Sequence, residues 1–150
     1  MNKKPIFSWQ EDDGIAICKI TNPENDYVAV GMARCHPEDR DMMSEKTGLE
    51  IAYHRALMNL YKNKVKNLKK ERRVHEDIYK TFMSMPSFDK ENRYIRVVRH
   101  RMHSLKEEIK VYQELIDNTR AYINDFIDNK TKFYNLTRAN RKAEEFKQEG

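Results

Sequence analysis

The sequence lacks an apolar run of membrane-spanning length, and its first residues, Met-Asn-Lys-Lys-Pro, do not follow the pattern of a secretory signal. Cysteine is scarce as well, with Cys18 and Cys35 alone. We therefore expect an intracellular protein of the cytoplasm, not bound to a membrane, with reduced cysteines. Four glycines and four prolines in 150 residues are also too few turn formers for an all-β fold.

Catalytic and metal-binding motifs are missing too. The sequence contains no glycine-rich phosphate loop, no nucleophile elbow and no zinc-protease motif. Cys35 and His36 are adjacent and Cys18 could converge on them, but a structural zinc site usually needs four ligands. We therefore expect no metal, no cofactor and no enzymatic activity, and we interpret both cysteines as small core residues, with His36 at a strand end.

Charged residues are abundant and unevenly placed. They make up 35% of the chain, against 39% hydrophobic residues, and the net charge is +5. Residues 1–60 hold 7 Lys and Arg against 10 Asp and Glu, whereas residues 61–150 hold 22 against 14. The predicted organisation is one structural domain, in which residues 1–60 form an acidic head and residues 61–150 form a basic helical hairpin with a polar C-terminal tail.

The head is predicted to contain a small antiparallel sheet. Candidate strands are Phe7–Trp9, Gly14–Thr21 and Tyr27–Cys35, separated by turn-forming residues. In the last strand, valine and methionine alternate with the small residues Ala29, Gly31 and Ala33. Because a sheet this small is marginally stable alone, we expect a helix to cover one face.

Two long helices are predicted after the sheet. Thr47-x-x-Glu50 is a capping box that places the first start near Gly48, and Met85-Pro86-Ser87 interrupts the helical pattern, with Ser87 as a candidate cap for the second helix. The first helix carries a three–four frame at 51, 54, 58, 61, 65, 68, 72, 75, 79 and 82, in which Arg72 and His75 are polar steps. The second repeats apolar residues more regularly, at 95, 98, 102, 105, 109, 112, 116, 119, 123, 126, 130 and 133.

A short loop between two long helices predicts an antiparallel hairpin, in which facing residues have numbers that add to about 172. The predicted fold class is therefore α+β: a small antiparallel β-meander packed on a long, coiled-coil-like helical hairpin, predominantly helical. Phe126, Phe133 and Tyr134 extend past the partner helix in this register. Either the sheet or a second subunit must cover them, and we predict a homodimer.

Basic residues gather on both arms of the hairpin. A polyanion such as nucleic acid or a nucleoprotein is the expected partner, although a charge run is also typical of a solvated helix face. The candidate nucleic-acid-binding residues are Lys62, Lys64, Lys66, Lys69, Lys70, Arg73, Arg96, Arg99, Arg101 and Lys106.

A second candidate surface is the acidic loop before the first helix. Acids are favourable near a helix N-terminus, so the loop has a structural explanation. Its methionines also favour contact with a protein partner, and a host nuclease is one candidate. The candidate partner-binding residues are Glu38, Asp39, Asp41, Met42 and Met43.

Two resemblances bear on function. The segment 7–61, a meander leading into "GLEIAYHRALMNL", resembles the last part of a double-stranded-RNA-binding domain, but that family's lysine cluster is replaced here by the mostly acidic 41–47. The pattern Val30-Gly31-x-Ala33-x-Cys35, Pro37-Glu38-Asp39, then Gly48-x-x-Ile51-Ala52-x-x-Arg55-Ala56 resembles small bacteriophage proteins of no known activity. This resemblance implies a phage source and a bacterial host cytoplasm.

Two function classes follow. The first is a non-enzymatic protein that associates with nucleic acid or a nucleoprotein through the basic hairpin. The alternative is a phage-encoded inhibitor of a bacterial defence nuclease, of the anti-CRISPR type, that acts by binding protein.

Overall fold

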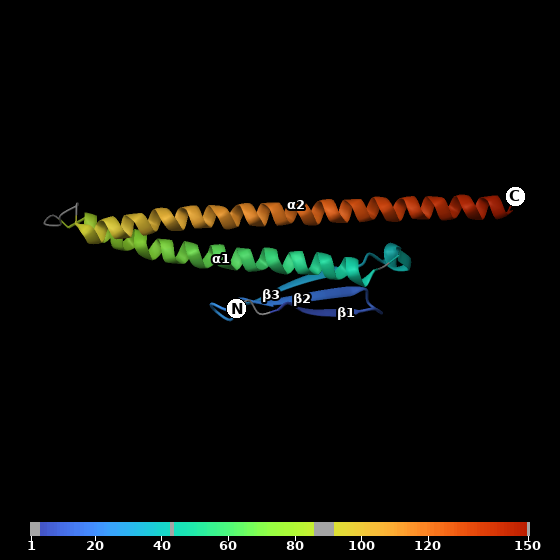
Figure 1. The fold of residues 1–150 in the computed structure, drawn as a ribbon, viewed down its shortest axis with the longest axis horizontal. Helices are drawn as coiled ribbons and strands as arrows, with labels where there is room; N and C mark the ends of the chain where they lie inside the picture. Colours follow the sequence, from blue (N-terminus) through green and yellow to red (C-terminus); the bar gives the residue numbers. More distant parts are fainter. Residues whose placement is uncertain (1–3, 43, 86–91, 150) are drawn as a thin grey trace. The chain divides into compact units, whose positions relative to one another are not determined.

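The computed structural model describes residues 4–42, 44–85 and 92–149, with the backbone alone at 38, 40, 41 and 149. Three strands come first, β1 (Ile6–Gln10), β2 (Ile15–Thr21) and β3 (Val28–Arg34). A short 3-10 helix η1 (Pro37–Met42) leads into α1 (Glu45–Met83) and α2 (Arg93–Glu149) (Figure 1). The two helices hold 39 and 57 residues, so the predicted α+β class, mostly helical, is confirmed.

The chain divides into two compact units. The first contains Met1–Asn59 together with Asn118–Gly150, and the second contains Leu60–Asp117. The sheet, the beginning of α1 and the end of α2 therefore belong to the first unit, whereas the second unit is a helical hairpin.

The sheet is an antiparallel meander in the order β1-β2-β3, as predicted. Its register pairs Phe7 with Cys18 and Cys18 with Gly31, so these three residues share one face. Gly14 ends the first turn with φ of 63°, a left-handed conformation that glycine adopts without strain. Asn22 orders the second turn, where its buried side chain accepts a hydrogen bond from the Glu24 amide at 3.0 Å.

Small residues allow α1 to lie very close to the sheet. Ala29, Gly31 and Ala33 are buried on the face of β3 toward the helix, and Ala52 and Ala56 are fully buried opposite them. A Cβ atom at Gly31 would lie only 2.0 Å from the Ala52 carbonyl oxygen and 2.3 Å from the Ala56 nitrogen. The small face of the predicted strand is therefore the one that the helix covers.

The open edge of β3 is closed by two side chains of α1. Arg55 donates to the Met32 carbonyl and Asn59 to the Val30 carbonyl, both at 2.7 Å. These bonds satisfy backbone groups that an exposed edge strand would offer to another chain.

The end of α2 packs on α1 in the first unit. The Tyr122 hydroxyl lies 3.2 Å from a Glu50 carboxylate oxygen, and the Tyr122 ring lies 4.4 Å from the His54 ring. In this unit α1 therefore lies between the sheet and α2 (Figure 1).

The predicted start of α1 was wrong by one turn. The helix begins at Glu45, and Ser44 caps it by accepting a hydrogen bond from the Thr47 amide at 3.4 Å. Glu50 does not close a capping box but contacts Tyr122 and His54 instead. Ser44 is an equally good cap residue, and it adds three helical residues, 45 to 47, before the predicted start at Gly48.

The other end of α1 and the start of α2 border residues that the structure does not describe. Pro86 and the candidate cap Ser87 lie outside the described residues. Beyond this gap α2 starts at Arg93, where the Asn92 side chain accepts from the Tyr94 amide at 2.8 Å. Asn92 is therefore the N-cap of α2.

The three–four seams are confirmed along most of both helices. Every seam position of α1 is buried or half-buried, and in α2 the same holds up to Lys130. Phe133, the last predicted seam residue, is 59% exposed. The coiled-coil pattern of α2 therefore continues in the sequence past the last seam residue that the rest of the chain covers.

Candidate nucleic-acid interface

The second unit is an antiparallel hairpin in the predicted register. The Tyr61 and Tyr112 rings lie 6.1 Å apart, the Phe82 and Tyr94 rings 5.5 Å apart, and Arg101 pairs with Glu71 at 2.8 Å. The numbers of these partners add to between 172 and 176. This register decides which basic residues of the two arms lie opposite one another.

The two polar steps of the α1 seam have structural partners. Arg72 Nε lies 3.2 Å from a Glu76 carboxylate oxygen, one turn further along the helix, in an ion pair. His75 Nδ1 donates to the Glu71 carbonyl at 2.9 Å. Both side chains are half-buried, so they belong to the packing of the hairpin rather than to its basic surface.

One side of the hairpin uses its basic residues in contacts within the chain. The Arg101 guanidinium binds Glu71 through two nitrogens, at 2.8 and 3.2 Å. This hydrogen bond raises the pKa of Arg101 further, so the arginine remains charged. On the same side, the Lys64 ammonium lies 5.7 Å from the centroid of the Tyr112 ring.

The opposite side carries two rows of exposed basic residues. Within each row the residues recur at intervals of three or four, apart from one interval of seven before Lys80, so each row follows one stripe of its helix. Each row is displaced from the seam of its own helix by the same rotation. When the two helices pack antiparallel, the two rows therefore lie on the same side of the hairpin. The α1 row is Lys62, Lys66, Lys69, Arg73 and Lys80, and the α2 row is Arg96, Arg99, His103, Lys106 and Lys110.

The confirmed register places basic residues across from each other in four successive rungs, and three of these pair one cation with another. These rungs are Lys62 with Lys110, Lys66 with Lys106, Lys69 with His103, and Arg73 with Arg99. Glu76 interrupts the α1 row, but it pairs with Arg72. We name the ten basic residues of the α1 row and the α2 row the double basic row.

The structure sorts the predicted nucleic-acid-binding residues into three groups. Lys64 and Arg101 lie on the opposite side with Tyr112 and Glu71, and exposed Lys70 lies beside the α1 row. The sequence prediction omitted His103 and Lys110, which the three–four spacing would have identified, and Lys80, which follows Arg73 by seven residues. The members brought into the double basic row are Lys62, Lys66, Lys69, Arg73, Arg96, Arg99 and Lys106.

The acidic loop is placed differently from its prediction. Asp39 pairs with Arg138 of α2, so its carboxylate is engaged within the chain, and Met42 is half-buried. The side chains of Glu38 and Asp41, and all of Met43, lie outside the described residues.

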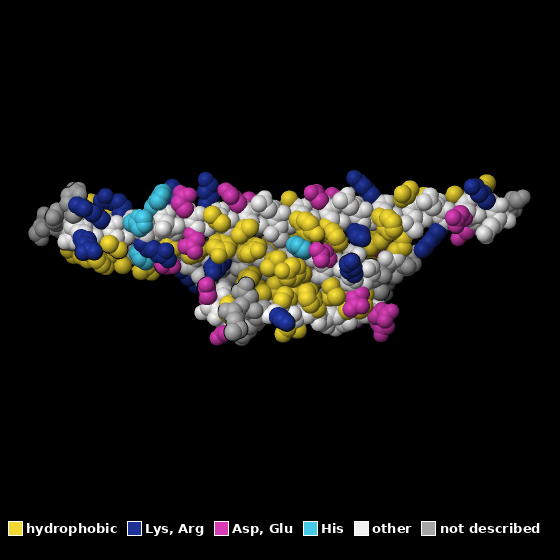
Figure 2. Space-filling view, in the orientation of Figure 1, with side chains coloured by type: hydrophobic (Ala, Val, Ile, Leu, Met, Phe, Trp, Pro, Cys, Tyr) yellow, Lys and Arg dark blue, Asp and Glu magenta, His cyan; other side chains and the backbone are white. Residues whose placement is uncertain are grey.

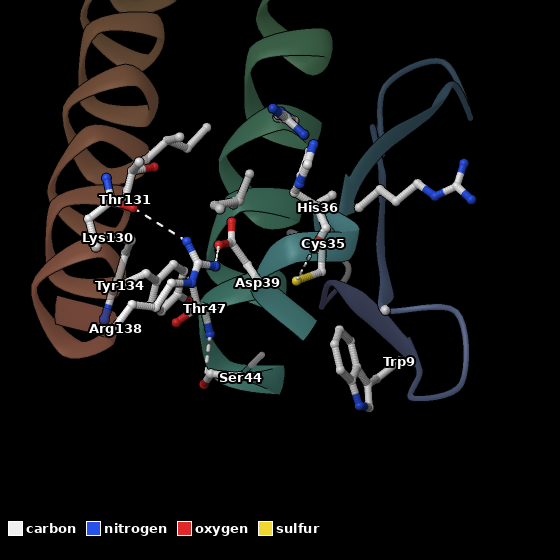
Figure 3. Close-up of a pocket in the computed structure, with 18 residues that line it drawn as sticks. Trp9, Cys35, His36, Asp39, Ser44, Thr47, Lys130, Thr131, Tyr134 and Arg138 are labelled. Atoms are coloured by element: carbon white, nitrogen blue, oxygen red, sulfur yellow. Dashed lines mark hydrogen bonds and ion pairs between the residues drawn. The ribbon is translucent and has the colours of Figure 1, made fainter. Parts of the chain in front are cut away.

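A cavity of about 490 Å³ adjoins this loop in the first unit. Figure 3 shows Lys130, Thr131, Tyr134 and Arg138 of α2 on one side of it and Trp9 and Cys35 on the other. Burial raises the pKa of the Tyr134 phenol; its hydrogen bond with Thr47 acts in the opposite direction, and Cys35 and Asp39 add to the rise. The cavity is therefore a polar junction that holds the end of α2 against the start of α1.

Neither cysteine forms a metal site in the described part of the chain. No group of three or more His, Cys, Asp or Glu residues able to hold a metal occurs among residues 4–42, 44–85 and 92–149. Cys18 is buried against α1 with a raised thiol pKa caused by burial, and half-buried Cys35 points its sulfur to the His36 carbonyl at 3.6 Å. Cys18 is thus a small core residue, as predicted.

Among the residues that the structure describes, no helix is long and apolar enough to span a bilayer. No protein-family model matches this chain, and no curated protein or solved structure gives a significant match.

Proposed function

We propose that this protein is a non-enzymatic nucleic-acid-binding protein that holds the phosphate backbone of a duplex with the double basic row. The proposal rests on the three rungs in which two cations face each other: Lys62 with Lys110, Lys66 with Lys106, and Arg73 with Arg99. A hairpin that needed these charges only for solubility would gain from acids among them, because facing cations repel each other. A polyanion removes that repulsion.

The dimensions favour backbone contact without reading of base sequence. The α2 row from Arg96 to Lys110 spans about 21 Å at ~1.5 Å per residue, and a duplex presents roughly twelve phosphates over that length. Two packed helices are together about 20 Å wide, more than the ~12 Å major groove admits. Between Lys62 and Lys80 and between Arg96 and Lys110, the two stripes hold Lys, Arg, His and one Glu, and no Asn or Gln, the residues that read adenine.

The same composition favours a duplex over a single strand. Proteins that bind single strands stack bases on exposed aromatic rings. No Phe, Tyr or Trp occupies a stripe position between Lys62 and Lys80 or between Arg96 and Lys110, and the nearby Tyr79 ring lies under the Arg99 guanidinium at 5.7 Å. We therefore expect weaker binding to single-stranded oligonucleotides of equal length.

The test is fluorescence anisotropy with a duplex DNA, a duplex RNA and a single strand, each of random sequence. The variant replaces Lys66, Lys69, Arg73 and Arg99 by Glu, and we expect it to lose binding to all three probes. The control variant makes the same change of charge at four exposed lysines outside the row: Lys4, Lys46, Lys142 and Lys147. Equal loss of binding by the control variant would mean that net charge alone explains the effect. Full binding by the variant of the double basic row would refute the proposal.

A second candidate function, inhibition of a bacterial defence nuclease by protein binding, is favoured by the open face of the sheet. Val30 and Met32 leave 44% and 54% of their surface exposed there, and Ile6 leaves 67%. Lys19 lies between Ile6 and Val30 in the register, and no acid lies on this face of the strands. Capture of a nuclease by a protein that binds none of the three oligonucleotides, with loss of capture on Val30→Glu, would select this function instead.

A further inference from the structure

The end of α2 carries an apolar stripe that the first unit covers only in part. Tyr122, Phe133 and Leu136 are 45%, 59% and 61% exposed, and half-buried Phe126 lies between them. They recur at three–four spacing with Asn129 at the centre, which is the pattern of a helix seam. Figure 2 shows hydrophobic side chains at the surface of α2 in this unit.

This stripe is complementary to itself when a second copy lies antiparallel. Around Asn129, facing residues have numbers that add to about 258, so Tyr122 faces Leu136 of the second copy and Phe126 faces Phe133. Asn129 then meets its own copy, where two amides can hydrogen-bond and fix the register. From the stripe alone we infer that the end of α2 is the interface of an antiparallel homodimer.

The flanking charges select the same occupant. Asp125 and Lys132 are both exposed and lie on one side of the stripe. In the antiparallel register each Asp125 lies beside Lys132 of the other copy, which gives two ion pairs related by the twofold axis. An unrelated apolar partner would not require this arrangement.

The size of the stripe predicts a reversible dimer. A large aromatic side chain buries roughly 150–250 Å², and Tyr122, Phe133 and Leu136 each leave about half of their surface open, so these three contribute on the order of 600 Å² over two copies. With the flanking residues, the interface reaches about 1,000 Å², the low end of specific interfaces, and we expect a dissociation constant of about micromolar order.

The first test is sedimentation velocity over a concentration series. We expect a particle of about twice the chain mass of 18.1 kDa at the highest concentration and its dissociation on dilution. Phe133→Asp with Leu136→Asp should remain monomeric with an unchanged helical spectrum. A wild-type monomer at about 100 μM, far above the expected micromolar constant, or a dimer that survives the double substitution, would overturn the inference.

The second test uses the charges and keeps the apolar stripe intact. Asp125→Lys alone sets lysine beside lysine, and Lys132→Asp alone sets aspartate beside aspartate. Each variant dimer should therefore dissociate at a higher protein concentration than the wild-type dimer. An equimolar mixture of the two variants should form a heterodimer, because both of its pairs are again opposite in sign. A mixture that dissociates like the separate variants would refute the antiparallel register. Neither variant touches the double basic row, so this result is independent of nucleic-acid binding.

Discussion

Replacing Gly31 by alanine is expected to destabilise the first unit strongly, because a single methyl group there has no room. The added Cβ would lie 2.0 Å from the Ala52 carbonyl oxygen and 2.3 Å from the Ala56 nitrogen. Overpacking usually costs about 1–3 kcal/mol when side chains can adjust. Here the obstacles are backbone atoms of α1, so either the helix or β3 must shift, and we expect a loss of about 3 kcal/mol or more.

Gly48→Ala is the matched control. Its Cβ would lie 3.1 Å from the Ala16 methyl group and from the edge of the Trp9 ring, which can move by a few tenths of an ångström. Alanine also gains up to ~1 kcal/mol over glycine within a helix. The control should therefore change stability by less than about 1 kcal/mol.

The assay is urea unfolding followed by fluorescence of Trp9, the single tryptophan, which lies in β1. The Gly31→Ala midpoint should fall well below wild type, while the Gly48→Ala midpoint stays close to it. Equal midpoints for Gly31→Ala and wild type would refute the close packing of α1 on the small face of β3.

Two further predictions concern the junction between η1, α1 and α2. Ser44→Ala should lower the free energy of unfolding by about 1 kcal/mol, as loss of an N-cap does, whereas Thr47→Ala should lower it less. If urea unfolding shows the larger loss for Thr47→Ala, Thr47 is the cap. The raised pKa of Tyr134 means that its contribution to stability is complete below pH 10 and is lost as pH rises through the folded pKa. Stability measured from pH 8 to about 11 should therefore fall more for wild type than for Tyr134→Phe, and parallel curves would contradict this.

Local patterns predicted the elements and the hairpin register. Alternating small residues in 29–33 and the three–four seams each repeat often enough that tertiary packing reinforces them. Thus Glu71 and Arg101, thirty residues apart, face each other as the predicted register requires. The start of α1 was misplaced because Ser44 and Thr47 both have cap chemistry, and local sequence does not rank them.

The junction had no comparable signal in the sequence. Arg138 lies in a polar stretch that reads as a tail, and its partner Asp39 is 99 residues away. Similarly, Lys64 and Arg101 look like members of one basic cluster, but the rotation of each helix about its seam separates them from the double basic row. These contacts depend on which face of its helix each residue occupies, and composition does not reveal that face.

The salt dependence of duplex binding tests the central claim most directly. If the double basic row releases about six counterions, the logarithm of the binding constant for duplex DNA should fall with the logarithm of salt concentration with a slope near −5. Replacing Lys66, Lys69, Arg73 and Arg99 by alanine should bring the slope to about −2, because each lost phosphate contact removes roughly 0.9. A slope that stays near −5 in this variant, or no duplex binding by wild type at about 50 mM salt, would contradict the account.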